Sequence, residues 1–286
     1  MISVPATVSG SPAHSLSGRR AAIHAFPCSA DRCPYVRHDT KAQPGLPTVT
    51  DPTSVMRATG IETGYGRVQV LWGAALDVKE KESVVLLGAN GAGKTTLLKV
   101  IVGLLPAWKG SVHLDPDDVT TWRTDKRVRR GMAYMSEIGV FPGLSIDENL
   151  RVGGQFIEKS ALKRRMEELY SYFPDIAHRR GALAGSLSGG QRKMLGIAKA
   201  LASSPRLLVM DEPSAGLSPL FVGQVIEVLS RFRESGLAML IAEQNIAFLD
   251  LADRVFTLDG GRIRFEGSVA DLQADDSLHR TYFGLD

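Results

Sequence analysis

One segment constrains the fold of this chain more than any other. The apolar run Ser83–Leu87 leads into the sequence Gly-Ala-Asn-Gly-Ala-Gly-Lys-Thr at 88–95, and a helical pattern follows over Thr96–Val102. A strand, a turn of the form G-x-x-x-x-G-K-[ST] and a helix together make a phosphate-binding loop. Glycines let backbone N–H groups turn toward phosphate oxygens, and the helix N-terminus adds partial positive charge. The residues expected to contact a nucleotide here are Gly88, Asn90, Gly91, Gly93, Lys94, Thr95 and Thr96.

Two carboxylates follow a second apolar strand. The apolar run Leu207–Met210 is followed directly by Asp211 and Glu212. The carboxyl ends of parallel strands form the ligand-binding edge of an open α/β sheet. We therefore expect Asp211 and the Thr95 hydroxyl to hold Mg²⁺, Lys94 to bind the terminal phosphates, and Glu212 to act on the attacking water. A solvated carboxylate pair is the alternative, and the phosphate loop in the same chain argues against it.

A third motif lies between these two. The sequence Leu-Ser-Gly-Gly-Gln at 187–191 precedes a helical run over Arg192–Ser203. Small residues at a helix N-terminus can open it to an anion, so Ser188, Gly189, Gly190 and Gln191 are candidate nucleotide contacts. The structural alternative is a Gly-Gly turn capped by Ser188.

Short strand patterns alternate with helical ones in the rest of the body. Pro219–Arg233 has apolar residues at helical spacing, and Ile146–Phe173 is helical without strands. This alternation predicts an α/β fold with a mainly parallel sheet and helices on both faces. The predicted strands, besides Ser83–Leu87, are Ala75–Val78, Arg206–Met210, Ala238–Ala242 and Arg254–Leu258.

Composition separates an N-terminal segment from this body. Residues 1–55 hold seven of the 14 prolines and no sustained periodicity, which is typical of disorder or of non-native upstream sequence, so we place the domain at 56–286 with Met56 as a candidate start. Cys28 and Cys33 lie there and make neither a disulfide framework nor a convincing metal site. The pair Arg19-Arg20 lacks the apolar run of a targeting signal. The near-neutral body argues against nucleic acid as a partner.

The order and spacing of GANGAGKT, LSGGQ and LLVMDEP resemble the nucleotide-binding subunits of ABC transporters, from about Arg57 to the C-terminus. The resemblance implies a P-loop NTPase (RecA-like) core with a small antiparallel β subdomain and an α-helical insertion over about 140–190. It implies ATP and Mg²⁺ as ligands and a head-to-tail dimer. In such a dimer Ser188 and the glycines after it would contact ATP held mainly by the other subunit, and Tyr65 would stack on adenine.

Further segments resemble the ATPases of branched-chain amino acid importers of LivF type, namely VFPGLSIDENL, DEPSAGLSP and AEQNIAF. This resemblance implies that Glu137 replaces the usual metal-linking glutamine and that Gln244 replaces the usual switch histidine. A glutamine can hydrogen-bond a γ-phosphate oxygen but cannot carry a proton. SEIGVF is one residue shorter than the related form, which affects the alignment of Glu137. The apolar loop with Val140 and Phe141 is a candidate permease contact, or it packs under the insertion.

The expected function is therefore that of an ATP-hydrolysing subunit of an ABC importer for branched-chain amino acids, bound to the cytoplasmic face of the membrane. Expected partners are a second ABC ATPase in a heterodimer, integral-membrane permease subunits and, indirectly, an extracytoplasmic solute-binding protein. Three alternatives stay open: a urea or short-chain amide importer, a mainly regulatory nucleotide-binding subunit, and a soluble ABC ATPase without a transport role. The last would need a coiled-coil insertion or a second cassette, which this chain does not contain.

Overall fold

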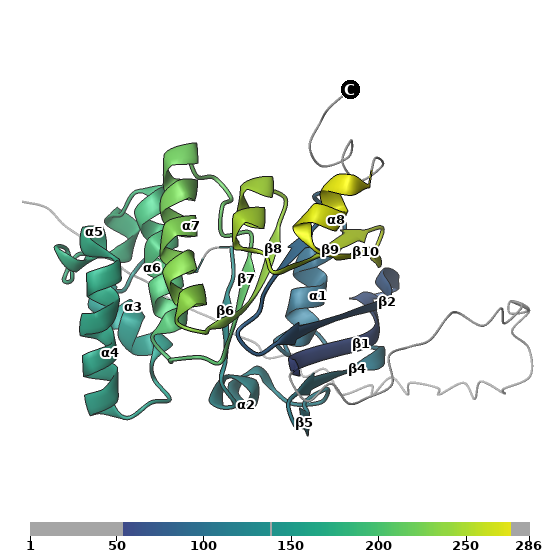
Figure 1. Ribbon diagram of the computed structural model, residues 1–286. Coiled ribbons are helices and arrows are strands. Elements are labelled where there is room, and N and C mark those ends of the chain that lie inside the picture. The colour runs from purple at the N-terminus through teal and green to yellow at the C-terminus, as the bar shows by residue number, and fades with distance from the viewer. Residues whose placement is uncertain (1–53, 138, 276–286) are drawn as a thin grey trace, which may run out of the picture. The chain divides into compact units, whose positions relative to one another are not determined.

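A computed structural model describes residues 54–137 and 139–275, and its centre is a six-stranded sheet of order β10-β9-β3-β8-β7-β6 (Figure 1). Strands β9, β3, β8, β7 and β6 run parallel, and β10 is an antiparallel edge strand. The strands are β1 (Ser54–Tyr65), β2 (Val68–Lys79), β3 (Ser83–Leu87), β4 (Lys109–Leu114), β5 (Asp117–Asp118), β6 (Met132–Met135), β7 (Leu207–Asp211), β8 (Ala238–Glu243), β9 (Arg254–Asp259) and β10 (Arg262–Gly267). The helices are α1 (Lys94–Ile101), α2 (Thr124–Arg129), α3 (Ile146–Gly153), α4 (Lys159–Tyr172), α5 (Pro174–Ala177), α6 (Gly189–Leu201), α7 (Pro219–Glu234) and α8 (Val269–Ala274), with 3-10 turns η1 (Ala184–Ser186) and η2 (Ile246–Leu251).

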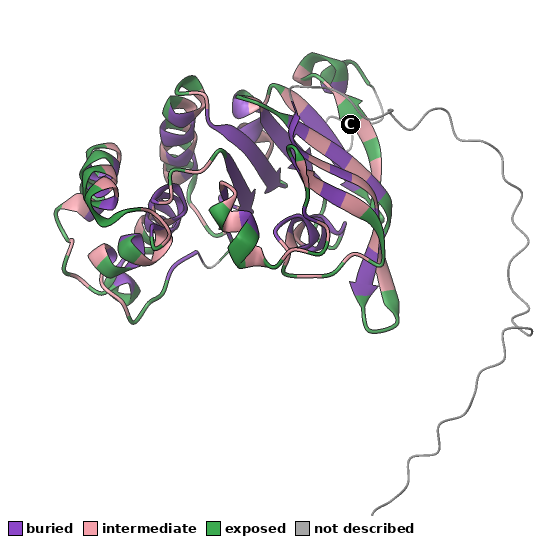
Figure 2. Cartoon of the chain, turned by 90° about the horizontal axis from the view of Figure 1, so that it is seen from below, coloured by how far each residue is buried: buried purple, intermediate pink, exposed green. Residues whose placement is uncertain are grey.

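The central strands are buried on both faces, as Figure 2 shows, and their alternating residues enter two different cores. Val85 and Leu87 of β3 pack in a cluster with residues of α6 and α7. Val84 and Leu86 point the other way, into a cluster with α1 and the antiparallel strands. Successive side chains of a strand face opposite sides, so continuous apolar runs are what a two-sided sheet requires.

The second sheet is antiparallel, with strand order β2-β1-β4-β5. It covers the face of the central sheet that also carries α1, so helices alone cover only the face with α6 and α7. The antiparallel β subdomain expected from the family resemblance is thus present. Strand β1 begins at Ser54, so Ser54 and Val55 already belong to this sheet although the sequence prediction placed them in the extension. The remaining predictions for that extension, and those for Cys28 and Cys33, lie outside the described residues.

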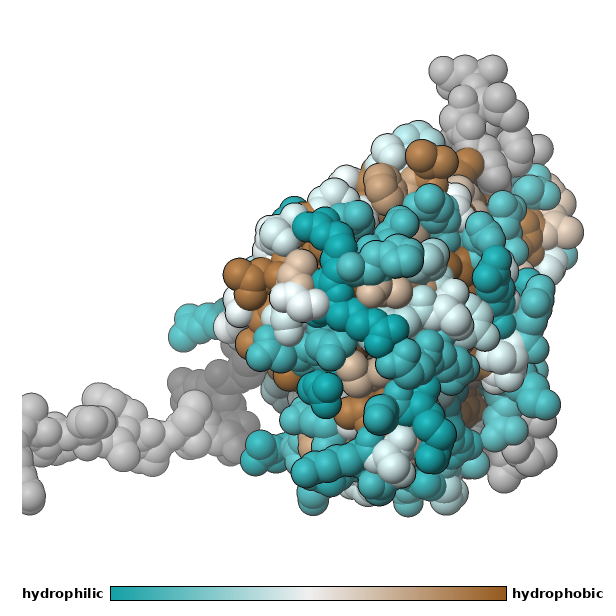
Figure 3. Space-filling view, turned by 90° about the vertical axis from the view of Figure 1, so that its left-hand side faces the viewer, coloured by the Kyte–Doolittle hydropathy of each residue, from teal (hydrophilic) through white to brown (hydrophobic). Residues whose placement is uncertain are grey.

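Helices α3, α4 and α5 form the insertion between β6 and α6. The predicted helical stretch Ile146–Phe173 is two helices, because α3 ends at Gly153 and a new cap at Glu158 starts α4. On α4 the stripe with Met166, Leu169 and Tyr170 is buried. Figure 3 shows the side of the molecule on which α4 and α5 lie, and its surface is mostly hydrophilic. Among the described residues, no helix combines the length and apolar character of a membrane span.

Candidate nucleotide-binding and hydrolysis site

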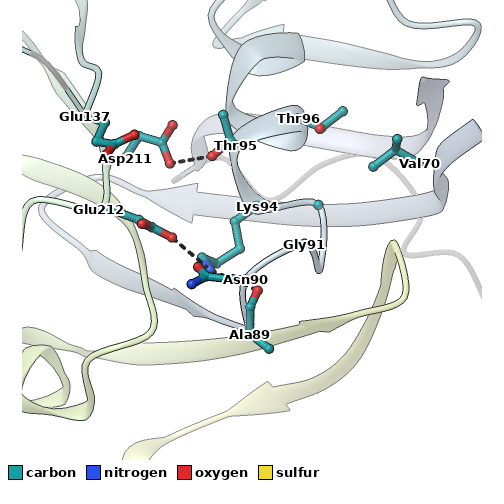
Figure 4. A pocket seen from close by; sticks show the side chains of 11 residues that line it. Val70, Ala89, Asn90, Gly91, Lys94, Thr95, Thr96, Glu137, Asp211 and Glu212 are labelled. Carbon is teal, nitrogen blue, oxygen red and sulfur yellow. Dashed lines mark hydrogen bonds and ion pairs between the residues drawn. The ribbon is translucent and has the colours of Figure 1, made fainter. Parts of the chain in front are cut away.

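Two of the three predicted motifs, the phosphate loop and the carboxylate pair at the end of β7, meet at one pocket of about 410 Å³. Figure 4 shows how Asn90 and Lys94 of the phosphate loop face Asp211 and Glu212 at the end of β7. Parallel β3 and β7 both end at this edge of the sheet, which brings segments far apart in sequence together. The complete lining is Val70, Ala89, Asn90, Gly91, Gly93, Lys94, Thr95, Thr96, Glu137, Asp211 and Glu212.

The phosphate loop has the backbone that its glycines predict. Gly91 and Gly93 have φ values of 82° and 108°, a region that other residues rarely adopt. Gly88 is required for close packing, because a Cβ there would lie 2.6 Å from the Leu258 carbonyl oxygen. Its own carbonyl accepts a hydrogen bond of 2.7 Å from Lys94 Nζ. The loop thus holds the buried ammonium at the N-terminus of α1, where a phosphate would find both charge and free N–H groups.

Glu212 lies opposite this lysine in an unusual backbone conformation. Its Oε1 is 3.2 Å from Lys94 Nζ. Its φ of 48° is in the left-handed region, which is strained for a residue with a side chain and is found mostly where surrounding contacts enforce it. Its N–H donates a 2.9 Å hydrogen bond to the Ala242 carbonyl of β8, the neighbouring strand. The conformation turns the carboxylate out of the sheet edge and into the pocket.

Asp211 presents the oxygen ligands expected of a magnesium site. It receives hydrogen bonds from the Thr95 hydroxyl at 3.0 Å and from the Tyr134 hydroxyl at 3.2 Å. Burial raises the pKa of Asp211, and the two hydroxyl donors oppose that rise. One buried carboxylate with an adjacent hydroxyl fits Mg²⁺, which binds through few protein oxygens and otherwise through water and phosphate. The described residues contain no cluster of three or more His, Cys, Asp or Glu side chains that would suggest another metal.

Two buried charged side chains that the sequence analysis did not identify tie the loops around this pocket together. Lys193 of α6 donates hydrogen bonds of 2.9 Å to the carbonyl oxygens of Glu137 and Glu212, and burial lowers its pKa. The fully buried Glu243 carboxylate accepts from the N–H and hydroxyl of Ser214 and from the Gln244 N–H. A carboxylate that directly follows an apolar strand was a signal for Glu243, as it was for Asp211; a lysine inside a helix gave no comparable signal.

Not all predicted contacts lie in this pocket. Glu137 lines it, but Tyr65 and Gln244 are exposed side chains outside its lining. Ser188 and Gln191 form a capping box at the N-terminus of α6, and Gly189 is exposed with open space around it. These residues belong to Leu187–Gln191, the signature segment, which also lies outside the lining.

Comparisons with known proteins define the family. Residues 71–215 match the family model described as ABC transporter. The chain is 36% identical over 226 residues to the high-affinity branched-chain amino acid transport ATP-binding protein BraG of Pseudomonas aeruginosa, covering 78% of this chain and 97% of the relative. It is 31% identical over 234 residues to a probable branched-chain amino acid transport ATP-binding protein LivF of Archaeoglobus fulgidus, covering 81% and 99%. It is 33% identical over 238 residues to the lipopolysaccharide export ATP-binding protein LptB of Escherichia coli K12, covering 82% and 98%.

Solved structures share the fold. An ATP-binding cassette of an ABC transporter in its ADP conformation superposes with a TM-score of 0.71 at 24% identity, over 81% of this chain and 99% of that one. The chain therefore belongs to the ABC transporter family. Within that family it is an ATP-hydrolysing, nucleotide-binding subunit of a transporter. The predicted P-loop NTPase fold is confirmed.

Proposed function

We propose that this subunit powers a branched-chain amino acid importer, with ATP and Mg²⁺ bound in the pocket between the phosphate loop and the end of β7. The observation that carries the proposal is the convergence of Lys94, Thr95, Asp211 and Glu212 on that pocket. The substrate class is supported by BraG and LivF, which match along nearly their whole lengths.

Each of these side chains has a task that follows from its chemistry. Bound Mg²⁺·ATP supplies the transferable phosphoryl group and a cation that offsets its charge. Lys94 binds the terminal phosphate oxygens, where it must exchange its contact with Glu212 for a contact with phosphate. Thr95 and Asp211 would hold the metal, and Glu137, which lines the same pocket, is a further candidate ligand. Glu212, released from the lysine, orients the attacking water, while Gln244 serves as a neutral hydrogen-bond donor.

The proposed partners follow from membership of the ABC transporter family. Ser188, Gly189, Gly190 and Gln191 would complete the site of a second ATPase subunit, most simply in a heterodimer, and Tyr65 would stack on the adenine. Closing and opening of this dimer would drive permease subunits, with the chain bound peripherally to the cytoplasmic face of the membrane. An extracytoplasmic solute-binding protein would deliver the solute. Phe141, 47% exposed on the loop before α3, is a candidate permease contact.

The test is solute uptake by cells whose chromosomal copy carries Glu212→Gln. We expect uptake of labelled leucine to fall to background while uptake of labelled urea is unchanged. Loss of urea uptake alone would keep the mechanism and replace the substrate class. If both solutes enter normally, the importer proposal fails, and lipopolysaccharide export, the process in which LptB acts, becomes the next to assay.

A further inference from the structure

Lys193 is a buried ammonium that no motif assigns to the site. Its side chain is 8% exposed, and Nζ lies 2.9 Å from each of two main-chain carbonyl oxygens. These belong to Glu137, in the loop after β6, and to Glu212, in the loop after β7. The same helix, α6, begins with the signature segment. One side chain therefore fastens the helix to two loops that line the nucleotide pocket.

The contact to Glu212 is made at the point where the backbone most needs support. Glu212 has a φ of 48°, and such a conformation persists only when its surroundings fix it. Its N–H is bonded to the Ala242 carbonyl, and its own carbonyl accepts from the Ala215 N–H at 3.1 Å as well as from Lys193. Without the ammonium, the peptide that follows Glu212 keeps only the longer of these two bonds, so the carboxylate loses part of its orientation.

We propose that Lys193 is a positioning residue for ATP hydrolysis, which holds the backbone of Glu212 against that of Glu137 so that the Glu212 carboxylate is aimed into the pocket. The inference rests on the catalytic role proposed above for Glu212. Lys193 does not line the pocket, so nucleotide affinity does not depend on it directly. Its loss should act on the rate of the chemical step, because a small displacement of a catalytic group is costly for catalysis and nearly neutral for binding.

The chain offers a matched control on the same helix. Lys199 is half-buried, and burial lowers its pKa too, but its Nζ lies over the Phe141 ring at 4.6 Å and it does not line the pocket. Replacement of either lysine by methionine keeps an unbranched apolar stem and removes an ammonium whose pKa is lowered by burial. The two variants therefore differ mainly in whether the Glu137 and Glu212 carbonyls lose the hydrogen bond from Lys193.

The experiment measures steady-state hydrolysis of Mg²⁺·ATP by the full chain with its partner ATPase and permease, for wild type, Lys193→Met, Lys193→Gln, Lys199→Met and Glu212→Gln. We expect both Lys193 variants to lose about tenfold or more in kcat, with KM and the affinity for a fluorescent ATP analogue within about twofold of wild type. Lys199→Met should match wild type. Analogue binding also establishes that each variant is folded.

Three outcomes overturn the inference: an unchanged kcat in the Lys193 variants, an equal loss in Lys199→Met, or a loss of analogue binding in both Lys193 variants. The last would assign Lys193 to folding of the pocket. Glu212→Gln separates this inference from the function on which it rests. If Glu212→Gln hydrolyses ATP like wild type, the proposed catalytic residue is wrong; if it is inactive while Lys193→Met is normal, only the positioning role fails.

Discussion

At the scale of single residues, the nucleotide pocket is organised by side chains that hold other side chains. Tyr134 is an example: its hydroxyl donates to the second carboxylate oxygen of Asp211, while Thr95 donates to the first. A Thr95 hydroxyl that binds a metal through its oxygen keeps its proton, so both hydroxyls would continue to orient the carboxylate, one on each oxygen. Groups that orient a metal ligand in this manner affect metal affinity strongly.

Tyr134→Phe should therefore raise the Mg²⁺ concentration needed for half-maximal activity by about tenfold, with kcat at saturating Mg²⁺ much less affected. The measurement is a Mg²⁺ titration of ATP hydrolysis, repeated as a titration of nucleotide-analogue binding. Tyr170→Phe is the control, because its hydroxyl also donates to a carboxylate, Asp147, in the helical insertion. The same Mg²⁺ dependence in Tyr134→Phe and wild type would contradict the assignment.

At the scale of elements, the start of α4 is a helix end that is stabilised by residues next to it in the sequence. The Glu158 carboxylate caps α4 by accepting hydrogen bonds from the N–H groups of Ser160 and Ala161 and from the Ser160 hydroxyl. These donors, the Ser160 hydroxyl first, lower the pKa of Glu158 from 4.5 to about 2. A depressed carboxylate pKa means that the folded state binds the proton less readily than the unfolded state, so the cap stabilises above pH 4.5 and is lost as the pH falls toward 2.

We therefore expect Glu158→Ala to lower Tm most above pH 5 and progressively less as the pH approaches 2, in thermal melts at several pH values. Ser171→Ala is the control on the same helix, because its hydroxyl donates to the Glu168 carbonyl and no carboxylate is involved. A Tm difference between wild type and Glu158→Ala that does not vary with pH would refute the charged cap.

Site residues that belong to a recognisable sequence segment could be predicted from the sequence. Residues that act by contacting distant segments could not. The roles expected of Lys94, Thr95, Asp211 and Glu212 follow from strand ends and a loop, so their convergence was predictable. Lys193, Tyr134 and Glu243 contact residues at or just after the ends of other strands, which the folded sheet brings close to them. The antiparallel strand β1 was missed because register shifts, one of them between Ala58 and Ile61, interrupt its alternation.

At the scale of the whole molecule, the signature segment has no partner in its own pocket. Gly189 is exposed at the N-terminus of α6, and a Cβ there would meet nothing within 4 Å. A helix N-terminus of this kind favours a bound anion such as a phosphate group. A variant with a carboxylate side chain at position 189 should fold without strain, because the space there is open. Its negative charge should repel the nucleotide of a second subunit.

We predict that Glu212→Gln with Mg²⁺·ATP associates with its partner ATPase, and that adding Gly189→Asp prevents this association while leaving nucleotide binding by the same chain intact. Light scattering coupled to gel filtration measures the association, and a fluorescent ATP analogue measures the binding. Gly181→Asp, also open around its Cβ and exposed, is the control. Association that is equally strong with and without Gly189→Asp would contradict the head-to-tail arrangement.

The catalytic role of Glu212 is tested most directly by a single-turnover comparison of wild type with Glu212→Gln, each assembled with its partner ATPase and permease. The 3.2 Å contact between Glu212 and Lys94 competes with phosphate, so neutralising the glutamate should strengthen ATP binding while removing the group that orients water. We expect Glu212→Gln to bind Mg²⁺·ATP at least as tightly as wild type and to hydrolyse it about a hundredfold or more slowly. Hydrolysis at the wild-type rate, or loss of binding, would contradict this role of Glu212.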